Sequence, residues 1–215
     1  MIRYYRDDMI ADAMAEILKY FFRELFKLLF PRKDTVKIAI LGCKGCGKTE
    51  LWCRLQGKDN LSHGGTSQEK IDSFIIGKKS DGTKVEVAAT KDIGGGDSWV
   101  SEYESLINHD GTFIYFLIDL TKMEEKNVDD IRDRLRKISA IMENGKFKNC
   151  GLRILATFFD KYNGTEAQAI SYIKEKVFKK RIKGIDMEKR IQVINVTDNN
   201  HVEIIREQIL KSIEE

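Results

Sequence analysis

The chain has 215 residues, enough for one domain of ordinary size and a short additional segment. One third of the residues (33%) are charged and 42% are apolar, a composition typical of a soluble globular protein. The 37 basic and 34 acidic side chains leave a formal net charge of +3, which is too balanced to predict nucleic-acid binding, and we expect none.

Residues 1–31 are predicted to form an amphipathic N-terminal helix. Its apolar side chains recur at spacings of three and four residues: Ile17, Leu18, Phe21, Phe22, Leu25, Leu28 and Leu29. Lys19, Arg23 and Lys27 form a basic stripe on the other side, and Pro31 ends the helix. The uncharged run is far shorter than the roughly 20 residues of a membrane span, and no signal peptide is evident.

Residues 34–215 alternate strand-like and helical patterns. The predicted strands are 36–42, 73–79, 84–93, 112–120, 152–159 and 191–197, with a hairpin turn at 80–83. The predicted helices are 47–57, 98–108, 127–143, 165–180 and 200–213. This order predicts a three-layer α/β domain, with a mostly parallel six-stranded sheet, one antiparallel hairpin strand and helices on both faces.

The stretch from Gly42 to Thr49, GCKGCGKT, matches G-x-x-x-x-G-K-[ST] in full, after a strand and before a helix. Glycines let the chain wrap tightly, so that successive N–H groups point at phosphate oxygens and the helix adds its positive end. Lys48 can reach the β- and γ-phosphates, and the Thr49 hydroxyl can ligate Mg²⁺. The motif therefore predicts a bound nucleoside triphosphate.

The cysteine pattern leaves two interpretations open. Cys43 and Cys46 form a C-x-x-C within the same turn, which is compatible with a redox pair or half of a metal site. A disulfide would distort a loop that needs its N–H groups, and no second Cys/His pair lies at zinc spacing. The alternative is free thiols in a reducing cytosol.

Asp92-Ile93-Gly94-Gly95 ends the predicted strand 84–93. A carboxylate at the end of a strand can hold Mg²⁺ through water. A glycine two or three residues later lets a backbone N–H meet a γ-phosphate, so that this loop senses whether the phosphate is present. The position of the motif, after a hairpin that follows the phosphate loop, strengthens this interpretation.

Together these motifs resemble a Ras-type GTPase domain, closest to the branch of Arf proteins and heterotrimeric G-protein alpha subunits. DIGGG (92–96) resembles the D-V-G-G-Q of that branch. Residues 135–161 resemble its helix, N-x-K-F turn and strand that ends in N-K-x-D, and 194–205 resemble its C-A-T-D stretch and last helix. The similarity covers about residues 34–213. Only 17 residues lie between Lys48 and Thr66, so the inserted helical domain of the alpha subunits is lacking.

The resemblance implies a P-loop G domain with GTP or GDP and Mg²⁺ as ligands, and it gives individual residues a role. Thr66 matches the switch threonine that ligates Mg²⁺, and Asp160 matches the carboxylate that accepts hydrogen bonds from guanine. The metal ligands are then Thr49, Thr66 and Asp92, and the catalytic candidates are Lys48, Thr66 and Lys44. The nucleotide contacts are Gly42, Lys44, Gly45, Cys46, Gly47, Lys48, Thr49, Glu50, Asp92, Gly95, Thr157, Phe158, Asp160, Val196 and Thr197.

Three positions depart from the family pattern. Thr157-Phe158 replaces the Asn-Lys pair, and Phe158 either stacks on the purine or belongs to the core. Gly96 replaces the glutamine that orients the attacking water, so hydrolysis should be slow unless Asp97, another side chain or a partner compensates. Lys44 either lies against the β–γ bridge of the nucleotide, like an arginine finger in cis, or points to solvent.

The sequence thus predicts a guanine-nucleotide switch with effector and regulatory protein partners. One alternative is a pseudo-GTPase interaction module without useful hydrolysis, and another is a P-loop phosphotransferase with a basic lid near 176–190. The N-terminal helix, residues 1–30, is expected to contact either a membrane surface or protein, which makes the chain cytoplasmic or peripheral on a membrane.

Overall fold

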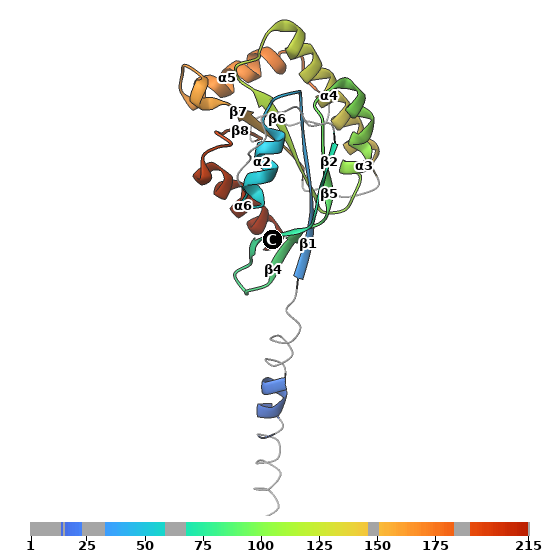
Figure 1. The fold of residues 1–215 in the computed structure, drawn as a ribbon, viewed down its shortest axis with the longest axis vertical. Coiled ribbons are helices and arrows are strands. Elements are labelled where there is room, and N and C mark those ends of the chain that lie inside the picture. Colours follow the sequence, from blue (N-terminus) through green and yellow to red (C-terminus); the bar gives the residue numbers. More distant parts are fainter. Residues whose placement is uncertain are drawn as a thin grey trace, which may run out of the picture.

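The computed structural model describes residues 14, 16–22, 33–58, 68–145, 151–182 and 190–214. It has a six-stranded sheet in the order β3-β4-β1-β6-β7-β8 and a separate pair, β2-β5 (Figure 1). The strands are β1 (Lys33–Gly42), β2 (Gln68–Ile71), β3 (Phe74–Lys78), β4 (Lys84–Val87), β5 (Thr90–Ile93), β6 (Thr112–Asp119), β7 (Leu152–Thr157) and β8 (Ile191–Val193).

The helices of the domain alternate with these strands. They are α2 (Lys48–Leu55), α3 (Tyr103–Ile107), α4 (Glu125–Asn144), α5 (Glu166–Val177) and α6 (Asn199–Glu214), with 3₁₀ helices η1 (Asp97–Glu102) and η2 (Phe159–Lys161). In the large sheet only the β3-β4 pair is antiparallel, and the other pairs run parallel. The predicted α/β class, six-stranded sheet and single hairpin strand are confirmed.

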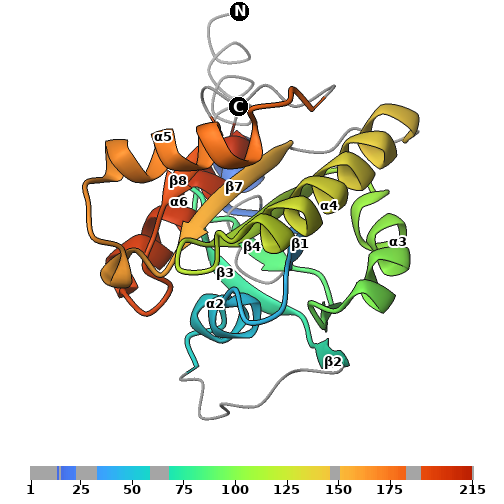
Figure 2. The ribbon, with the colours of Figure 1, turned by 90° about the horizontal axis from the view of Figure 1, so that it is seen from above.

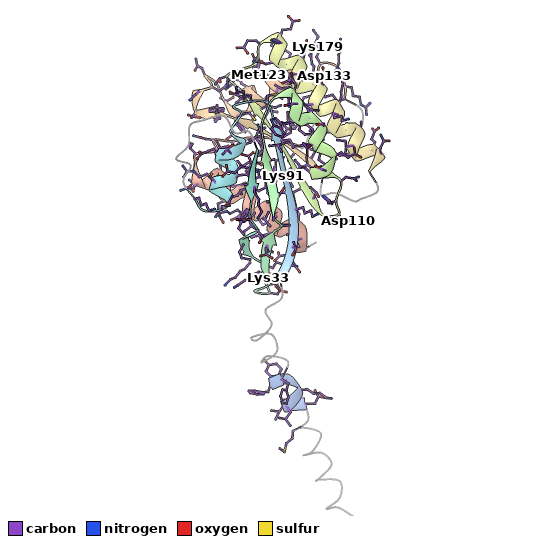
Figure 3. The ribbon with its side chains drawn as sticks, turned by 45° about the vertical axis from the view of Figure 1, so that its right-hand side comes forward. Lys33, Lys91, Asp110, Met123, Asp133 and Lys179 are labelled. Carbon is purple, nitrogen blue, oxygen red and sulfur yellow. The ribbon has the colours of Figure 1, made fainter. Side chains whose placement is uncertain are left out.

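The sheet is covered by helices on both faces, which gives three layers (Figure 2). All eight residues of β6 are buried, so this strand contributes to two cores. Phe116 and Ile118 pack on one side with α3, α4 and α5, whereas Tyr115 and Leu117 pack on the other with α2 and α6. Charged side chains such as Lys33, Asp133 and Lys179 are exposed around these cores (Figure 3). The near-continuous apolar run of β6 is the pattern expected of a strand buried on both faces.

The predicted strand 84–93 is wrong as a single element. The chain pairs with β1 as far as Val87, and the Ala88 N–H donates to Val36 O at 2.8 Å. It then changes partner, and β5 pairs antiparallel with β2, which was not predicted. The sequence of β2, QEKI, is short and mostly polar, so no periodicity distinguished it from the loop before it.

Several predicted boundaries also shift. β7 ends at Thr157 rather than 159, because Phe158 adopts left-handed backbone angles (φ 58°, ψ 37°) that a strand cannot contain. β8 ends at Val193 rather than 197, and the predicted helix 98–108 begins as the 3₁₀ helix η1.

Residues 16–22 of the N-terminal segment are helical, as predicted. Met14, Ile17, Leu18, Tyr20, Phe21 and Phe22 all expose half or more of their surface. None of them belongs to either core cluster. The rest of the predicted helix 1–31 lies outside the described residues. Within the described parts of the chain, no helix is long and apolar enough to cross a membrane.

Helix α5 begins with a capping box, in which the N-cap residue and the third residue of the helix exchange hydrogen bonds. Thr165 Oγ1 accepts from the Gln168 N–H at 3.3 Å, and Gln168 Oε1 accepts from the Thr165 N–H at 2.8 Å. Thr165→Ala should lower the free energy of unfolding by about 1 kcal/mol in urea denaturation, because the Gln168 N–H loses its acceptor. Thr165→Ser should retain most of the stability, and equal losses in both variants would contradict this role.

Candidate functional site

The candidate site lies at the carboxyl edge of the parallel strands. β6 lies between β1 and β7 and pairs with both. The register places Gly42 opposite Leu117 and Asp119 opposite Thr157, so the ends of the three strands converge. Ligand sites in open α/β sheets form outside this edge.

The first part of the site is the glycine loop, residues 42–49, between β1 and α2. Gly42, Gly45 and Gly47 have φ values of 144°, 74° and 95°, which residues other than glycine rarely adopt. Gly47 is the N-cap of α2 and has no side chain to satisfy the first N–H groups of the helix. The loop therefore presents N–H groups and the positive end of α2 together, an arrangement that attracts anions.

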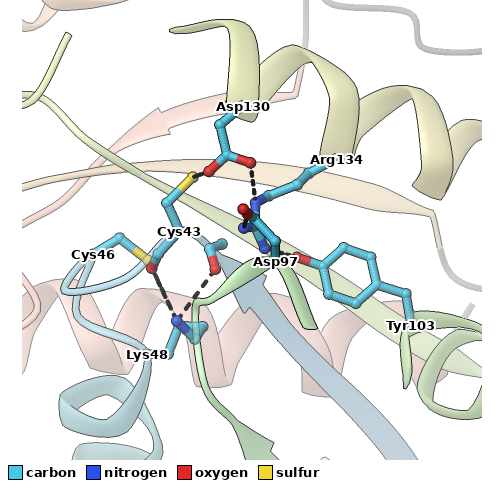
Figure 4. Close-up of polar contacts among 8 residues, drawn as sticks. Cys43, Cys46, Lys48, Asp97, Tyr103, Asp130 and Arg134 are labelled. Atoms are coloured by element: carbon cyan, nitrogen blue, oxygen red, sulfur yellow. Dashed lines mark hydrogen bonds and ion pairs between the residues drawn. The ribbon is translucent and has the colours of Figure 1, made fainter. Parts of the chain in front are cut away.

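The loop wraps around the side chain of Lys48, which is only 6% exposed. Lys48 Nζ donates to the Gly42 carbonyl at 3.2 Å and to the Cys43 carbonyl at 3.0 Å, and it lies 4.0 Å from Cys46 Sγ (Figure 4). An ammonium group has three N–H donors, and two of them are fixed by loop carbonyls. The charge of Lys48 is thus held in place inside the loop.

Thr49 and Asp92 meet beside the loop, as predicted for a joint metal site. Thr49 Oγ1 donates to Asp92 Oδ2 at 2.5 Å. Asp92 is completely buried, and no hydrogen-bond partner for its Oδ1 is found among the described residues. Burial raises the pKa of Asp92, while the Thr49 hydrogen bond and the Lys48 charge lower it. A buried carboxylate oxygen without a partner, next to a hydroxyl, fits a hard cation such as Mg²⁺.

Gly95 brings the loop after β5 into contact with the glycine loop. A Cβ placed on Gly95 would lie 2.2 Å from Lys44 N and 2.3 Å from the Cys43 carbonyl carbon. Only glycine allows so close an approach between two backbones. A Cβ placed on Gly96, by contrast, would have its nearest neighbour 3.9 Å away, on Trp99.

Arg134 of α4 connects this loop to its surroundings (Figure 4). Its side chain is 2% exposed and donates to Asp97 Oδ1 at 2.8 Å, Asp130 Oδ1 at 2.8 Å and the Tyr103 hydroxyl at 3.2 Å. Cys43 Sγ in turn donates to Asp130 Oδ2 at 3.2 Å. The glycine loop, α4, α3 and η1 are therefore joined by one polar network centred on the buried Arg134 guanidinium.

Asp97, the residue that follows Gly96, is engaged by Arg134. Its side chain is 93% exposed, but its Oδ1 accepts from the buried guanidinium. Asp97 was one of the groups considered as a replacement for the missing glutamine, besides another side chain or a partner. In this structure the carboxylate is held by α4 rather than free to orient water over the glycine loop.

The C-x-x-C is not a disulfide, because Cys43, Cys46 and Cys53 are free thiols. Burial, followed by the charge of Asp130, raises the pKa of Cys43 to about 12. Burial also raises the pKa of Cys46. Both thiols are thus protonated at neutral pH and poor nucleophiles. This agrees with the free-thiol interpretation rather than the redox one.

A cavity of about 250 Å³ adjoins the network between the glycine loop, the loop after β5, the end of β6 and α4. Its lining includes Lys44, Asp119 and Lys122. Lys44 is exposed, in agreement with the prediction that it points to solvent, although it also borders this cavity.

Thr157 was predicted to contact the nucleotide, but its side chain is completely buried. Its Oγ1 lies 3.0 Å from the Cys46 carbonyl oxygen and 3.2 Å from the Ile118 carbonyl oxygen, and its single hydrogen is donated to one of them or shared between them. The hydroxyl therefore ties the end of β7 to the glycine loop and cannot itself touch a base. Thr157 positions the loop.

Phe158 and Asp160 follow where β7 ends. Phe158 is the only non-glycine residue with positive φ in the described chain, and such a backbone is unusual for a bulky side chain. Lys161 Nζ lies 5.0 Å from the Phe158 ring centroid, so a cation covers this ring. Asp160 is exposed. Phe158 is partly buried, so neither of its two predicted roles, stacking on a base or packing in the core, is decided by its position.

Val196 and Thr197 lie on the β8–α6 side of the same edge. A Cβ on Gly47 would meet Val196 Cγ2 at 3.3 Å, so Val196 supports the glycine loop. The Thr197 N–H already donates to Asn195 Oδ1 at 3.1 Å.

Glu50, another predicted nucleotide contact, pairs with Arg54 along α2 at 2.8 Å. Thr66 lies outside the described residues.

Sequence reasoning missed the charged groups Asp119, Lys122, Asp130 and Arg134. Asp119 was detectable, because it is the only acid in the apolar run of β6 and stands at its carboxyl end. Asp130 and Arg134 are four residues apart on a helix, a spacing that usually marks an ordinary surface ion pair. Nothing in the sequence distinguished this pair from Arg132 or Arg136, which pair with Asp129 and Asp133.

Comparison with known proteins does not assign this site. A scan against models of protein families finds no match to the chain. A search of curated proteins finds no relative that matches it.

Gly95 and Gly96 provide a matched test of the contact between the two loops. Gly95→Ala should lower the free energy of unfolding by about 1–3 kcal/mol, because its Cβ overlaps the backbone at Lys44. Gly96→Ala has open space and should stay within about 0.5 kcal/mol of the parent. Urea denaturation of both variants measures this difference, and equal effects would show that the loops are not in contact.

Proposed function

We propose that this chain is a guanine-nucleotide-binding switch of the small-GTPase type, with a P-loop G domain, Mg²⁺-dependent GTP binding and slow intrinsic hydrolysis. The observation that carries the proposal is the arrangement of three groups at one strand edge. A glycine loop encloses the Lys48 ammonium, and Thr49 meets the buried Asp92 beside it. Each residue of this arrangement suits phosphate or a hard cation.

The phosphates would lie on the N–H groups of the glycine loop, and the N–H of Lys48 that no loop carbonyl holds would face them. Thr49 and Asp92 would hold the Mg²⁺, which neutralises phosphate charge when bound. Gly95 lies directly against Lys44, so a γ-phosphate near this contact would compete with or reorder the loop after β5. That competition is a physical basis for a switch.

Asp160 supports a preference for guanine. It is exposed next to the end of β7, at the same edge as the glycine loop. A carboxylate accepts from both guanine N1–H and N2–H, donors that adenine does not offer there. The ring of Phe158 adds a surface for stacking, with Lys161 on one of its faces.

A second candidate function is a pseudo-GTPase, an interaction module that binds nucleotide without useful hydrolysis. Gly96 has no side chain to orient water, and Arg134 holds the neighbouring Asp97. These two observations favour slow or absent turnover, but they leave the binding groups Lys48, Thr49 and Asp92 unaffected. The two candidates therefore differ in phosphate release and not in affinity.

The partners of such a switch would be effector and regulatory proteins. The exposed side chains of Ile17, Phe21 and Phe22 suit the apolar surface of a partner or the interface of a membrane. Peripheral attachment of a cytoplasmic protein through residues 1–30 is therefore part of the proposal.

The first experiment identifies the nucleotide that co-purifies with the protein and titrates the stripped protein with GTP, GDP and ATP, with and without Mg²⁺. We expect guanine nucleotides to bind. Lys48→Ala should weaken GTP binding by about tenfold to hundredfold, because a charged hydrogen-bond donor is lost.

Lys79→Ala is the matched control, because Lys79 of the β3–β4 hairpin pairs at 2.9 Å with Asp34 near the start of β1, at the opposite end of that strand from the glycine loop. It should bind GTP like the parent. If the parent protein binds none of the three nucleotides, the proposed function is wrong. If it binds GTP but releases no phosphate over hours, the pseudo-GTPase is the correct candidate.

Asp160→Asn tests the base preference. The amide keeps one acceptor but turns the other into a donor, so GTP affinity should fall by about a hundredfold while xanthosine triphosphate, with an oxygen at C2, gains affinity. Competition titrations measure this ratio. Asp133→Asn, a change of the same kind at an exposed position of α4, should leave the ratio as in the parent. An unchanged ratio in Asp160→Asn would place the base elsewhere.

A further inference from the structure

Lys122, in the turn between β6 and α4, lies at the rim of the glycine loop. A Cβ placed on Gly45 would be 3.0 Å from Lys122 Nζ. Gly45 itself is exposed and has a φ of 74°. The ammonium group therefore stands beside the backbone of the loop, on a different structural element from Lys48.

One buried carboxylate fixes this position. Asp119 has a side chain only 7% exposed, and its Oδ2 lies 3.1 Å from Lys122 Nζ. Its Oδ1 accepts from the Thr121 N–H at 2.9 Å and from the Thr121 hydroxyl at 2.6 Å. The Lys122 N–H also donates to the Asp119 carbonyl at 3.2 Å. The turn and the lysine head are thus pre-organised by the end of a central strand.

The ammonium group also remains accessible. The side chain of Lys122 is 50% exposed, and Asp119 occupies one of its three N–H donors. Asp119 compensates one positive charge at Lys122. The buried Lys48 meets the Gly42 and Cys43 carbonyls and Cys46 Sγ, and no residue of the glycine loop offers it a carboxylate. A phosphate anion bound at this loop would be attracted by both ammonium groups.

We propose that Lys122 is a catalytic residue of this site, a built-in cation that contacts the phosphates of the nucleoside triphosphate and stabilises their charge during hydrolysis. This inference rests on the proposed function. In the reaction, water attacks the γ-phosphorus, the bond from that phosphorus to the β–γ bridging oxygen breaks, and the electron pair stays on the diphosphate. The proton lost by water goes to the released phosphate. A fixed ammonium stabilises the charge that develops on these oxygens.

The structure favours Lys122 over the other groups near the loop. Gly96 offers no side chain, and Asp97 is held by Arg134. Lys44 is exposed, and no hydrogen bond or ion pair within the described chain fixes its ammonium group. Lys122 is the exposed cation of this rim that a buried partner positions.

The test compares Lys122→Ala, Lys122→Gln and Lys122→Arg in the full chain with Mg²⁺, by single-turnover release of phosphate from GTP and by affinity for GDP. We expect the alanine and glutamine variants to lower the hydrolysis rate by on the order of tenfold to hundredfold. GDP affinity should change by less than about threefold, because the effect concerns charge that develops in the transition state. The arginine variant should retain most of the rate.

A merely structural ion pair with Asp119 would give a different pattern. The hydrolysis rate of Lys122→Arg would then be no higher than that of Lys122→Ala. In the alanine and glutamine variants, stability and GDP affinity would fall along with the hydrolysis rate. Lys79→Ala, which removes another lysine–aspartate pair, should leave the rate unchanged.

Two results would overturn the proposal for Lys122 while nucleotide binding stands. One is an unchanged single-turnover rate in Lys122→Ala, and the other is a parent protein that binds GTP but hydrolyses none. A parent protein that binds no nucleotide would instead overturn the proposed function itself.

Discussion

The parallel pairing of β1 with β6 is the constraint on which the rest of the structure depends. Six consecutive register pairs, from Lys37↔Thr112 to Gly42↔Leu117, fix where β1 ends relative to its neighbour. Because β6 also pairs with β7, the same register places Asp119 opposite Thr157. A slip by one residue would shift Gly42 relative to Leu117 and move the glycine loop away from the ends of β6 and β7. The convergence of loops at one edge is therefore a consequence of sheet packing.

The buried polar side chains are concentrated at this edge. Lys48, Asp92, Asp119, Arg134 and Thr157 are five of the seven buried polar or charged residues of the described chain, and all contact or adjoin the glycine loop or the loop after β5. Burial of such groups costs stability unless they find partners. Their partners come from different elements, as when Thr157 donates to Cys46 O and Arg134 bridges three side chains. This edge is thus held by polar contacts, while the interior of the sheet is held by apolar packing.

The sequence predicted those parts of the structure that local patterns determine. The mostly parallel six-stranded sheet with one hairpin strand, the glycine loop and the meeting of Thr49 with Asp92 follow from periodicity and from a motif with known geometry. The split of the strand 84–93 did not follow, because the partner of its second half is the polar segment 68–71. The role of Thr157 was also missed, since a threonine at a strand end gives no sign that its hydroxyl turns inward to a carbonyl of Cys46. Long-range contacts of single polar atoms have no signature in a local pattern.

The distribution of charges at the edge separates binding from turnover. Lys48 is fixed by the Gly42 and Cys43 carbonyls, and Thr49 is fixed by Asp92; none of these hydrogen bonds involves Gly96 or Asp97 of the loop after β5. That loop offers Gly96 without a side chain, and Arg134 holds Asp97 to α4. If the chain hydrolyses its nucleotide as proposed, the β6–α4 turn provides a positioned cation, Lys122, on a third element. Under the proposed function such a site would hold its ligand through Lys48, Thr49 and Asp92, while its rate would depend on one peripheral charge, as suits a slow switch.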